Sequence, residues 1–246
     1  MTLLLLPALL GCAALACATT SKDRTMEVER HPPKQRRSNT LMVLLPGAGD
    51  APAAYVENGF VGALSEARGD IDVLAVDAHA GYYFGRTIID RLREDVIEPA
   101  RAEGYEQIWL VGISMGGFGA LLFTQHHGEM IDGLIVLAPY LGKARTLRPM
   151  NAVGVRAWEP GPAEGDYSYE LWRWLKGYQD QESSPGHPPL YLGYGLDDRS
   201  ARAHALLSDL LPADHTFTGD GGHDWNVWTP LWQRILASAE LPPAPQ

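Results

Sequence analysis

Ser114 stands in a short motif whose residue types suit a serine nucleophile. The motif is Gly112-Ile113-Ser114-Met115-Gly116. Because a bare G-x-S-x-G pattern also arises by chance, the assignment depends on the elements predicted on either side of it. The apolar run over 108–111 predicts a strand directly before it, and 117–127 predicts a helix directly after it. A sharp strand-to-helix turn exposes a serine hydroxyl, and the helix amino terminus offers free N–H groups to a developing oxyanion. We therefore predict that Ser114 is a nucleophile.

His223 is the histidine best placed to act as the base that a serine nucleophile needs. It lies in Gly221-Gly222-His223-Asp224-Trp225, after the last predicted strand, where glycines let a loop carry the imidazole over the sheet edge. The alternative is a turn histidine satisfied by backbone contacts. Asp197 and Asp198 follow the strand predicted over 190–194, and either could orient the imidazole and stabilise its charged form.

The turn Pro46-Gly47-Ala48-Gly49 follows the first predicted core strand and could complete an oxyanion site. We expect the backbone N–H groups of Ala48 and Met115 to hold the oxygen of a tetrahedral intermediate. A plain tight turn is the alternative. The glycine spacing fits neither common phosphate-binding pattern, and the sequence has no H-E-x-x-H motif or cysteine cluster. We therefore expect neither a cofactor nor a metal.

Short β-rich apolar runs alternate with helical patterns from residue 40 onward, which predicts a doubly wound, mostly parallel α/β sheet. The predicted strands are 41–45, 71–76, 108–111, 134–137, 190–194 and 215–218, and the predicted helices include 86–103, 117–127, 203–211 and 226–239. We assign 41–246 to one domain. An aromatic-rich insertion over 141–189 interrupts the alternation and is expected to act as a cap beside the substrate pocket. The alternative is that its aromatic side chains cover a small core of their own.

The first 17 residues read as a separate targeting unit. An apolar run ends at Leu9-Leu10-Gly11-Cys12, which resembles the lipobox of bacterial lipoproteins, so Cys12 is the predicted lipidation site and Cys17 a weaker one. A cleaved secretory signal is the alternative. Residues 18–40 are polar and are expected to form a flexible tether. These features predict export to the bacterial cell envelope with a lipid anchor on the periplasmic face.

The negative charge of the chain argues against nucleic acid as a partner. The formal net charge is −10, and residues 1–40 carry six of the 20 basic side chains but only three of the 30 acidic ones, so the rest of the chain is more acidic still. Such a domain repels nucleic acid. We expect a small-molecule substrate, neutral or cationic rather than anionic.

From about Leu41 to Leu236 the chain resembles the α/β-hydrolase superfamily, in particular small bacterial carboxylesterases of the tributyrin-esterase and S-formylglutathione-hydrolase branch. Besides the Ser114 motif, the resemblance rests on 195–199 as a G-x-x-D loop and on 222–228 as a G-x-H-x-W-x-x-W segment. The G-x-x-D spacing favours Asp198 over Asp197 as the acid. Pro46 departs from the family pattern, because it replaces the usual histidine of the oxyanion turn.

This resemblance implies a serine esterase that cleaves a carboxylic ester through an acyl-enzyme, without fixing the ester. The same three residues would also serve a thioesterase or an acyltransferase. In a different class, the fold could belong to a non-catalytic lipoprotein that binds an envelope ligand. The complete set of serine, histidine and aspartate argues against that last reading.

Overall fold

The computed structural model describes residues 24–161, 166–180 and 186–244, and within them the strands form one seven-stranded sheet. The spatial order is β1-β3-β2-β4-β5-β6-β7. All neighbouring pairs from β3 to β7 are parallel, and β1 alone is antiparallel, to β3 at the edge. The strands are β1 (Val28–His31), β2 (Thr40–Leu45), β3 (Asp72–Val76), β4 (Gln107–Ile113), β5 (Gly133–Leu137), β6 (Leu190–Gly195) and β7 (Thr216–Gly219).

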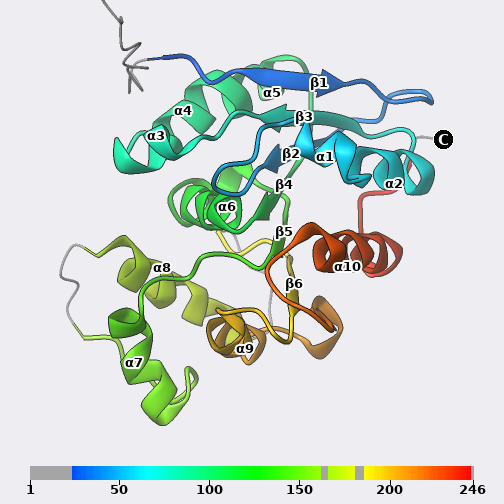
Figure 1. Ribbon diagram of the computed structural model, residues 1–246. Coiled ribbons are helices and arrows are strands. Elements are labelled where there is room, and N and C mark those ends of the chain that lie inside the picture. Colours follow the sequence, from blue (N-terminus) through cyan, green and yellow to red (C-terminus); the bar gives the residue numbers. More distant parts are fainter. Residues whose placement is uncertain (1–23, 162–165, 181–185, 245–246) are drawn as a thin grey trace, which may run out of the picture.

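Helices cover both faces of the sheet (Figure 1). They are α1 (Ala54–Glu57), α2 (Phe60–Ala67), α3 (Ala80–Phe84), α4 (Ile88–Leu92), α5 (Glu98–Ala102), α6 (Met115–His127), α7 (Ala144–Val153), α8 (Tyr167–Leu175), α9 (Ala201–Ser208) and α10 (Trp225–Ser238). A π-helical turn over Arg93–Ile97 joins α4 to α5. The helix predicted over 86–103 is therefore present as one continuous helical segment over 88–102, with this π-helical turn in its middle.

Strand β2 shows why the sheet needs two helical layers. All six of its residues are buried, and successive side chains of a strand point to opposite faces. Leu41, Val43 and Leu45 pack into the core that includes α4, α6, α8 and α9. Met42 and Leu44 pack on the other side with α1, α2 and α10. The predicted doubly wound α/β fold is confirmed.

Strand β1 corrects one expectation, because it lies inside the segment 18–40 that was predicted to be a flexible tether. Val28–His31 pairs with β3 from Val28↔Val76 to His31↔Val73, and Met26 just before it is buried. The strand was missed because its side chains are mostly exposed, so it has no alternating apolar pattern. Backbone hydrogen bonds hold it in place. The predicted leader over 1–17 lies outside the described residues.

The insertion over 141–189 provides α7 and α8, and most of its aromatic side chains belong to the core. Trp158 and Trp172 are buried in the same core as α6, and Trp172 Nε1 donates to the Leu141 carbonyl at 2.8 Å. Tyr167 is the exception, since it is partly exposed and lines a pocket. The expected cap thus joins the helical layer through α8. Among the described residues, no helix has the length and apolar character needed to cross a membrane.

Candidate active site

Ser114 occupies a strained turn between β4 and α6. Its backbone has φ 53° and ψ −112°, a region that side-chain-bearing residues adopt only when the surroundings impose it. Three hydrogen bonds do so here. Ser114 N donates to Leu137 O at 2.9 Å, and Ser114 O accepts from Phe118 N at 3.1 Å and Tyr140 N at 2.9 Å. The turn therefore has its direction fixed by α6 and by the end of β5.

Two glycines let this turn pack closely against its neighbours. A Cβ on Gly112 would lie 2.5 Å from the Gly116 carbonyl oxygen, and one on Gly116 would lie 2.0 Å from Leu45 O at the end of β2. Both distances are far inside van der Waals contact. The glycines of the G-x-S-x-G motif are thus explained by close approach of backbone to backbone.

His223 links Ser114 to Asp198. Its Nε2 lies 2.9 Å from Ser114 Oγ, and its Nδ1 lies 2.6 Å from Asp198 Oδ2. Because an ionised carboxylate can only accept, Nδ1 carries the proton and Nε2 is left to accept from the serine hydroxyl. This is the arrangement that a general base requires.

Asp198 is buried at 5% exposure, yet it stays an anion. Burial raises the pKa of its carboxyl, but hydrogen bonds from His223 and from the Ser200 amide outweigh burial and leave the pKa below its usual value. The Ser200 N–H donates to Asp198 Oδ1 at 2.7 Å. One carboxylate thereby orients the imidazole and supports the start of α9.

Asp197 points elsewhere. It is exposed, its Oδ2 accepts from Gly221 N at 3.3 Å, and its own N–H donates to Gly221 O at 2.9 Å. The structure thus brings Asp198 to His223 and leaves Asp197 bracing the loop that carries the histidine.

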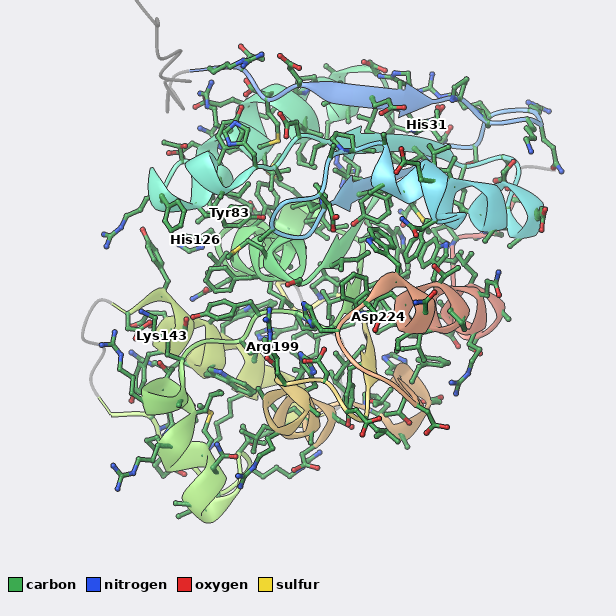
Figure 2. The ribbon with its side chains drawn as sticks, viewed as in Figure 1. His31, Tyr83, His126, Lys143, Arg199 and Asp224 are labelled. Atoms are coloured by element: carbon green, nitrogen blue, oxygen red, sulfur yellow. The ribbon has the colours of Figure 1, made fainter. Side chains whose placement is uncertain are left out.

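Trp228 packs against the imidazole of His223. The ring of Trp228 stands perpendicular to the imidazole with centroids 5.0 Å apart. Asp224, at the start of α10 (Figure 2), accepts from Asn226 N at 3.0 Å and fixes the first turn of that helix. The segment following His223 therefore both ends the loop and supports the ring.

The predicted oxyanion donors flank Ser114. Met115 is the first residue of α6, and N–H groups of a first helical turn have no partner inside their own helix. On the other side, the turn 46–50 approaches closely, because a Cβ on Gly47 would lie 3.6 Å from Ser114 Cβ. Ala48, the next residue, is exposed in this turn. The two predicted donors thus lie at the start of α6 and in the turn 46–50, both of which border the serine.

Sequence reasoning missed two ionisable residues at this site. The same Cβ position on Gly47 lies 3.1 Å from Asp50 Oδ2, so a carboxylate borders the oxyanion turn. Burial raises the pKa of Asp50. His204 on α9 is fully buried and its Nε2 donates to the Pro139 carbonyl at 3.0 Å. A lone aspartate in a turn and a histidine in a helix give no sequence signal.

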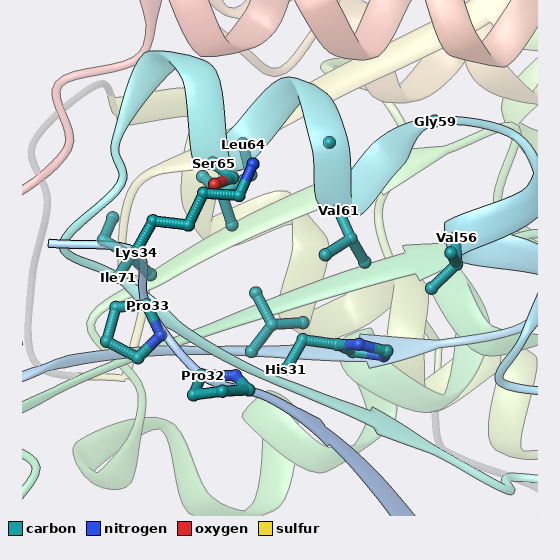
Figure 3. A pocket seen from close by; sticks show the side chains of 12 residues that line it. His31, Pro32, Pro33, Lys34, Val56, Gly59, Val61, Leu64, Ser65 and Ile71 are labelled. Atoms are coloured by element: carbon teal, nitrogen blue, oxygen red, sulfur yellow. The ribbon is translucent and has the colours of Figure 1, made fainter.

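A pocket of about 350 Å³ lies against two residues that hold the serine turn. Phe118 and Tyr140, the two residues whose amides donate to Ser114 O, form part of its wall. A second pocket, of about 300 Å³, lies between β1 and α2 and involves the amino end of β3 (Figure 3). The three site residues follow the carboxyl ends of their strands, whereas this second pocket involves the amino end of β3, so it lies away from them. The described part of the chain contains no cluster of three or more side chains suited to hold a metal ion.

Comparisons with known proteins agree with this architecture. The family model of the alpha/beta hydrolase family matches residues 42–245. No curated protein matches the sequence.

Several solved structures share the fold at low sequence identity. The S-formylglutathione hydrolase of Staphylococcus aureus is 19% identical, with a TM-score of 0.57 over 82% of this chain and 81% of that one. A fluorophosphonate-binding serine hydrolase of the same organism is 16% identical, with a TM-score of 0.56 over 85% and 90%. The monoacylglycerol lipase of Paleococcus ferrophilus is 14% identical, with a TM-score of 0.54 over 87% and 99%. From its sheet, its strained serine turn and the family model that spans most of its length, the chain belongs to the α/β-hydrolase family.

Proposed function

We propose that this protein is a serine hydrolase that cleaves carboxylic esters through an acyl-enzyme intermediate. The observation that carries the proposal is the continuous contact from Ser114 Oγ through both nitrogens of His223 to Asp198. It is supported by the esterases and lipases among proteins of similar fold. A ligand-binding protein without catalysis has no need of a base aligned on a strained serine.

In the first half-reaction, His223 Nε2 takes the Ser114 proton while Oγ attacks the ester carbonyl. Asp198 stabilises the imidazolium that forms. The amides of Met115 and Ala48 hold the negative oxygen of the tetrahedral intermediate. Collapse of this intermediate transfers the proton from His223 to the leaving alcohol and leaves an ester on Ser114. Water then repeats the same steps and releases the acid.

Two measurements test this function. Folded protein should hydrolyse p-nitrophenyl acetate or butyrate, and a fluorophosphonate probe should modify Ser114, because the turn exposes an activated hydroxyl. Ser114→Ala should abolish both with an unchanged circular dichroism spectrum. Labelling at a different serine, or absence of both reactions in folded protein, would refute the proposal.

We also propose that the chain is exported and anchored to the membrane through lipidated Cys12. The support is the lipobox resemblance of 9–12. Expression of the full chain in a bacterium should give a protein that partitions into detergent and whose mass includes a diacylglyceryl group. Cys12→Ser should abolish the lipid while Cys17→Ser keeps it. The opposite result would move the site to Cys17, and an unmodified cytosolic chain would overturn the proposal.

A further inference from the structure

We infer that the pocket beside Ser114 recognises an anionic group on the ester substrate. This inference rests on the proposed function, since it assigns a substrate class to the same site. It also reverses the expectation, drawn from net charge, that neutral or cationic substrates fit best.

Two residues that line the pocket also hydrogen-bond to the backbone of Ser114. Phe118 and Tyr140 both donate their amides to Ser114 O, and their rings meet edge to face with centroids 5.4 Å apart. Two residues of the pocket wall thus contact the backbone of Ser114, and the proposal places one half of an ester bound at Ser114 beside their rings. The volume of about 350 Å³ suits a small group rather than a long chain.

Three cations and one carboxylate line this space. The cations are Arg86, Lys143 and Arg145, and the carboxylate is Asp166. Asp166 is already engaged, because Arg145 Nη2 lies 3.5 Å from its Oδ2 and its Oδ1 accepts from Ser168 N at 3.0 Å. Within the described part of the chain, neither Lys143 nor Arg86 forms an ion pair. Two positive charges are thus left uncompensated at the pocket.

Arg86 and Lys143 belong to different elements at the pocket. Arg86 has φ 58°, a conformation rare for a residue with a side chain. Its guanidinium lies over the ring of Tyr167 at 5.3 Å, which bridges the α3–α4 turn to the start of α8. Lys143 directly precedes α7, in the segment that leads away from Tyr140 (Figure 2). The two cations therefore approach the pocket from separate segments.

This positive lining contrasts with the charge of the whole chain, which has 30 acidic and 20 basic side chains. The overall charge disfavours the approach of an anion, so affinity for one must come from nearby cations such as Arg86 and Lys143. A carboxylate on the substrate could form with Lys143 the ion pair that Lys143 does not form within the described part of the chain.

Matched substrates test the inference. We would compare p-nitrophenyl hemiglutarate with p-nitrophenyl pentanoate for an anion on the acyl half, and 4-acetoxybenzoate with 4-methylphenyl acetate for an anion on the alcohol half. In at least one pair, the anionic-to-neutral ratio of kcat/KM should fall about two- to fivefold in Lys143→Gln, as expected for loss of one exposed, partly screened charge. It should fall further in the Arg86→Gln, Lys143→Gln double variant. Intrinsic reactivity differences within a pair cancel, because the same pair is compared between proteins.

Arg148→Gln is the matched control. Arg148 is also exposed and lies on α7, but it is not among the pocket residues. Its ratio should equal that of the unsubstituted protein. Raising the salt concentration should reduce the preference of the unsubstituted protein and have little effect in the double variant.

The outcomes separate the two claims. If the neutral esters are hydrolysed but the ratio is the same in all variants, the anionic pocket is wrong and ester hydrolysis stands. If the unsubstituted, folded protein hydrolyses none of the four esters and no probe labels Ser114, the proposed function itself fails. A fall in the ratio specific to Lys143 and Arg86 supports the inference.

Discussion

Asp198 holds His223 and the amino end of α9 with the two oxygens of one carboxylate. Oδ2 lies 2.6 Å from His223 Nδ1, and Oδ1 accepts from the Ser200 amide at 2.7 Å. The second bond keeps the carboxylate from rotating, so the first has a fixed direction. Orientation of the base and the start of a helix are therefore coupled through one side chain.

The first prediction separates the adjacent aspartates. Asp198→Asn should lower kcat by up to ~10⁴-fold, because an amide cannot stabilise the imidazolium and can select the wrong tautomer. Asp197→Asn should change turnover by less than about threefold, since its bond to Gly221 N is long and exposed. Steady-state ester hydrolysis by both variants decides the matter. A larger loss in Asp197→Asn would move the acid by one residue.

The second prediction concerns the packing of the serine turn. Gly116→Ala should destabilise the protein by about 3 kcal/mol or more, because its Cβ would meet the backbone of Leu45 rather than a movable side chain. Gly62→Ala is the control. Gly62 lies within α2 and a Cβ there meets nothing within 4 Å, so this change should stabilise by about 0.5–1 kcal/mol. Urea unfolding of both variants tests the contrast, and equal effects would contradict it.

The third prediction concerns buried His204. Burial lowers its pKa from the usual 6.5, although the charge of Asp198 opposes that shift. The unfolded chain therefore binds a proton more readily than the folded one. Stability from this residue is complete above about pH 6.5 and is lost as the pH falls toward the lowered pKa.

His204→Gln provides the test of this pH dependence. A glutamine can place its amide nitrogen near the position of Nε2 and keep a donor for Pro139 O, but it does not titrate. The urea midpoint of the unsubstituted protein should drop more between pH 7.5 and pH 5 than that of the variant. Equal drops would show that His204 is not responsible.

The fourth prediction concerns Asp50 beside the oxyanion turn. Its raised pKa means that the carboxyl ionises at a higher pH than an ordinary aspartate. Once ionised, its charge opposes the developing negative oxygen. Asp50→Asn should therefore raise kcat/KM about two- to fivefold near pH 7.5 and have no effect at a pH where Asp50 is protonated. Because the two proteins differ only at Asp50, the ratio of variant to unsubstituted rates across pH isolates its contribution. A variant slower at every pH would contradict this.

The sequence was sufficient for the fold and for much of the site because both leave local patterns. Strands such as β2, buried on both faces, are continuous apolar runs, and a serine between two glycines after such a run marks the turn. The choice between Asp197 and Asp198 needed the family's loop spacing, since adjacent residues have the same local pattern.

Other features could not be predicted because they depend on contacts between distant segments. Arg86 and Tyr167 meet across 81 positions, and nothing near either one indicates the other. Edge strand β1 is held by backbone bonds to β3, and those leave no hydrophobic periodicity. His204 reaches Pro139 only after α9 has packed against the sheet.

The three side chains of the proposed catalytic site are unequally anchored across the sheet. Ser114 follows β4 in the interior, whereas His223 follows β7, a strand of four residues that forms the edge of the described sheet and pairs with β6. Edge strands open locally at lower free energy than central ones. Transient fraying of β7 would carry the base away while the strained serine turn stayed intact. Heating or mild denaturant should thus switch off turnover reversibly before the core melts, so that loss of activity precedes loss of tryptophan burial.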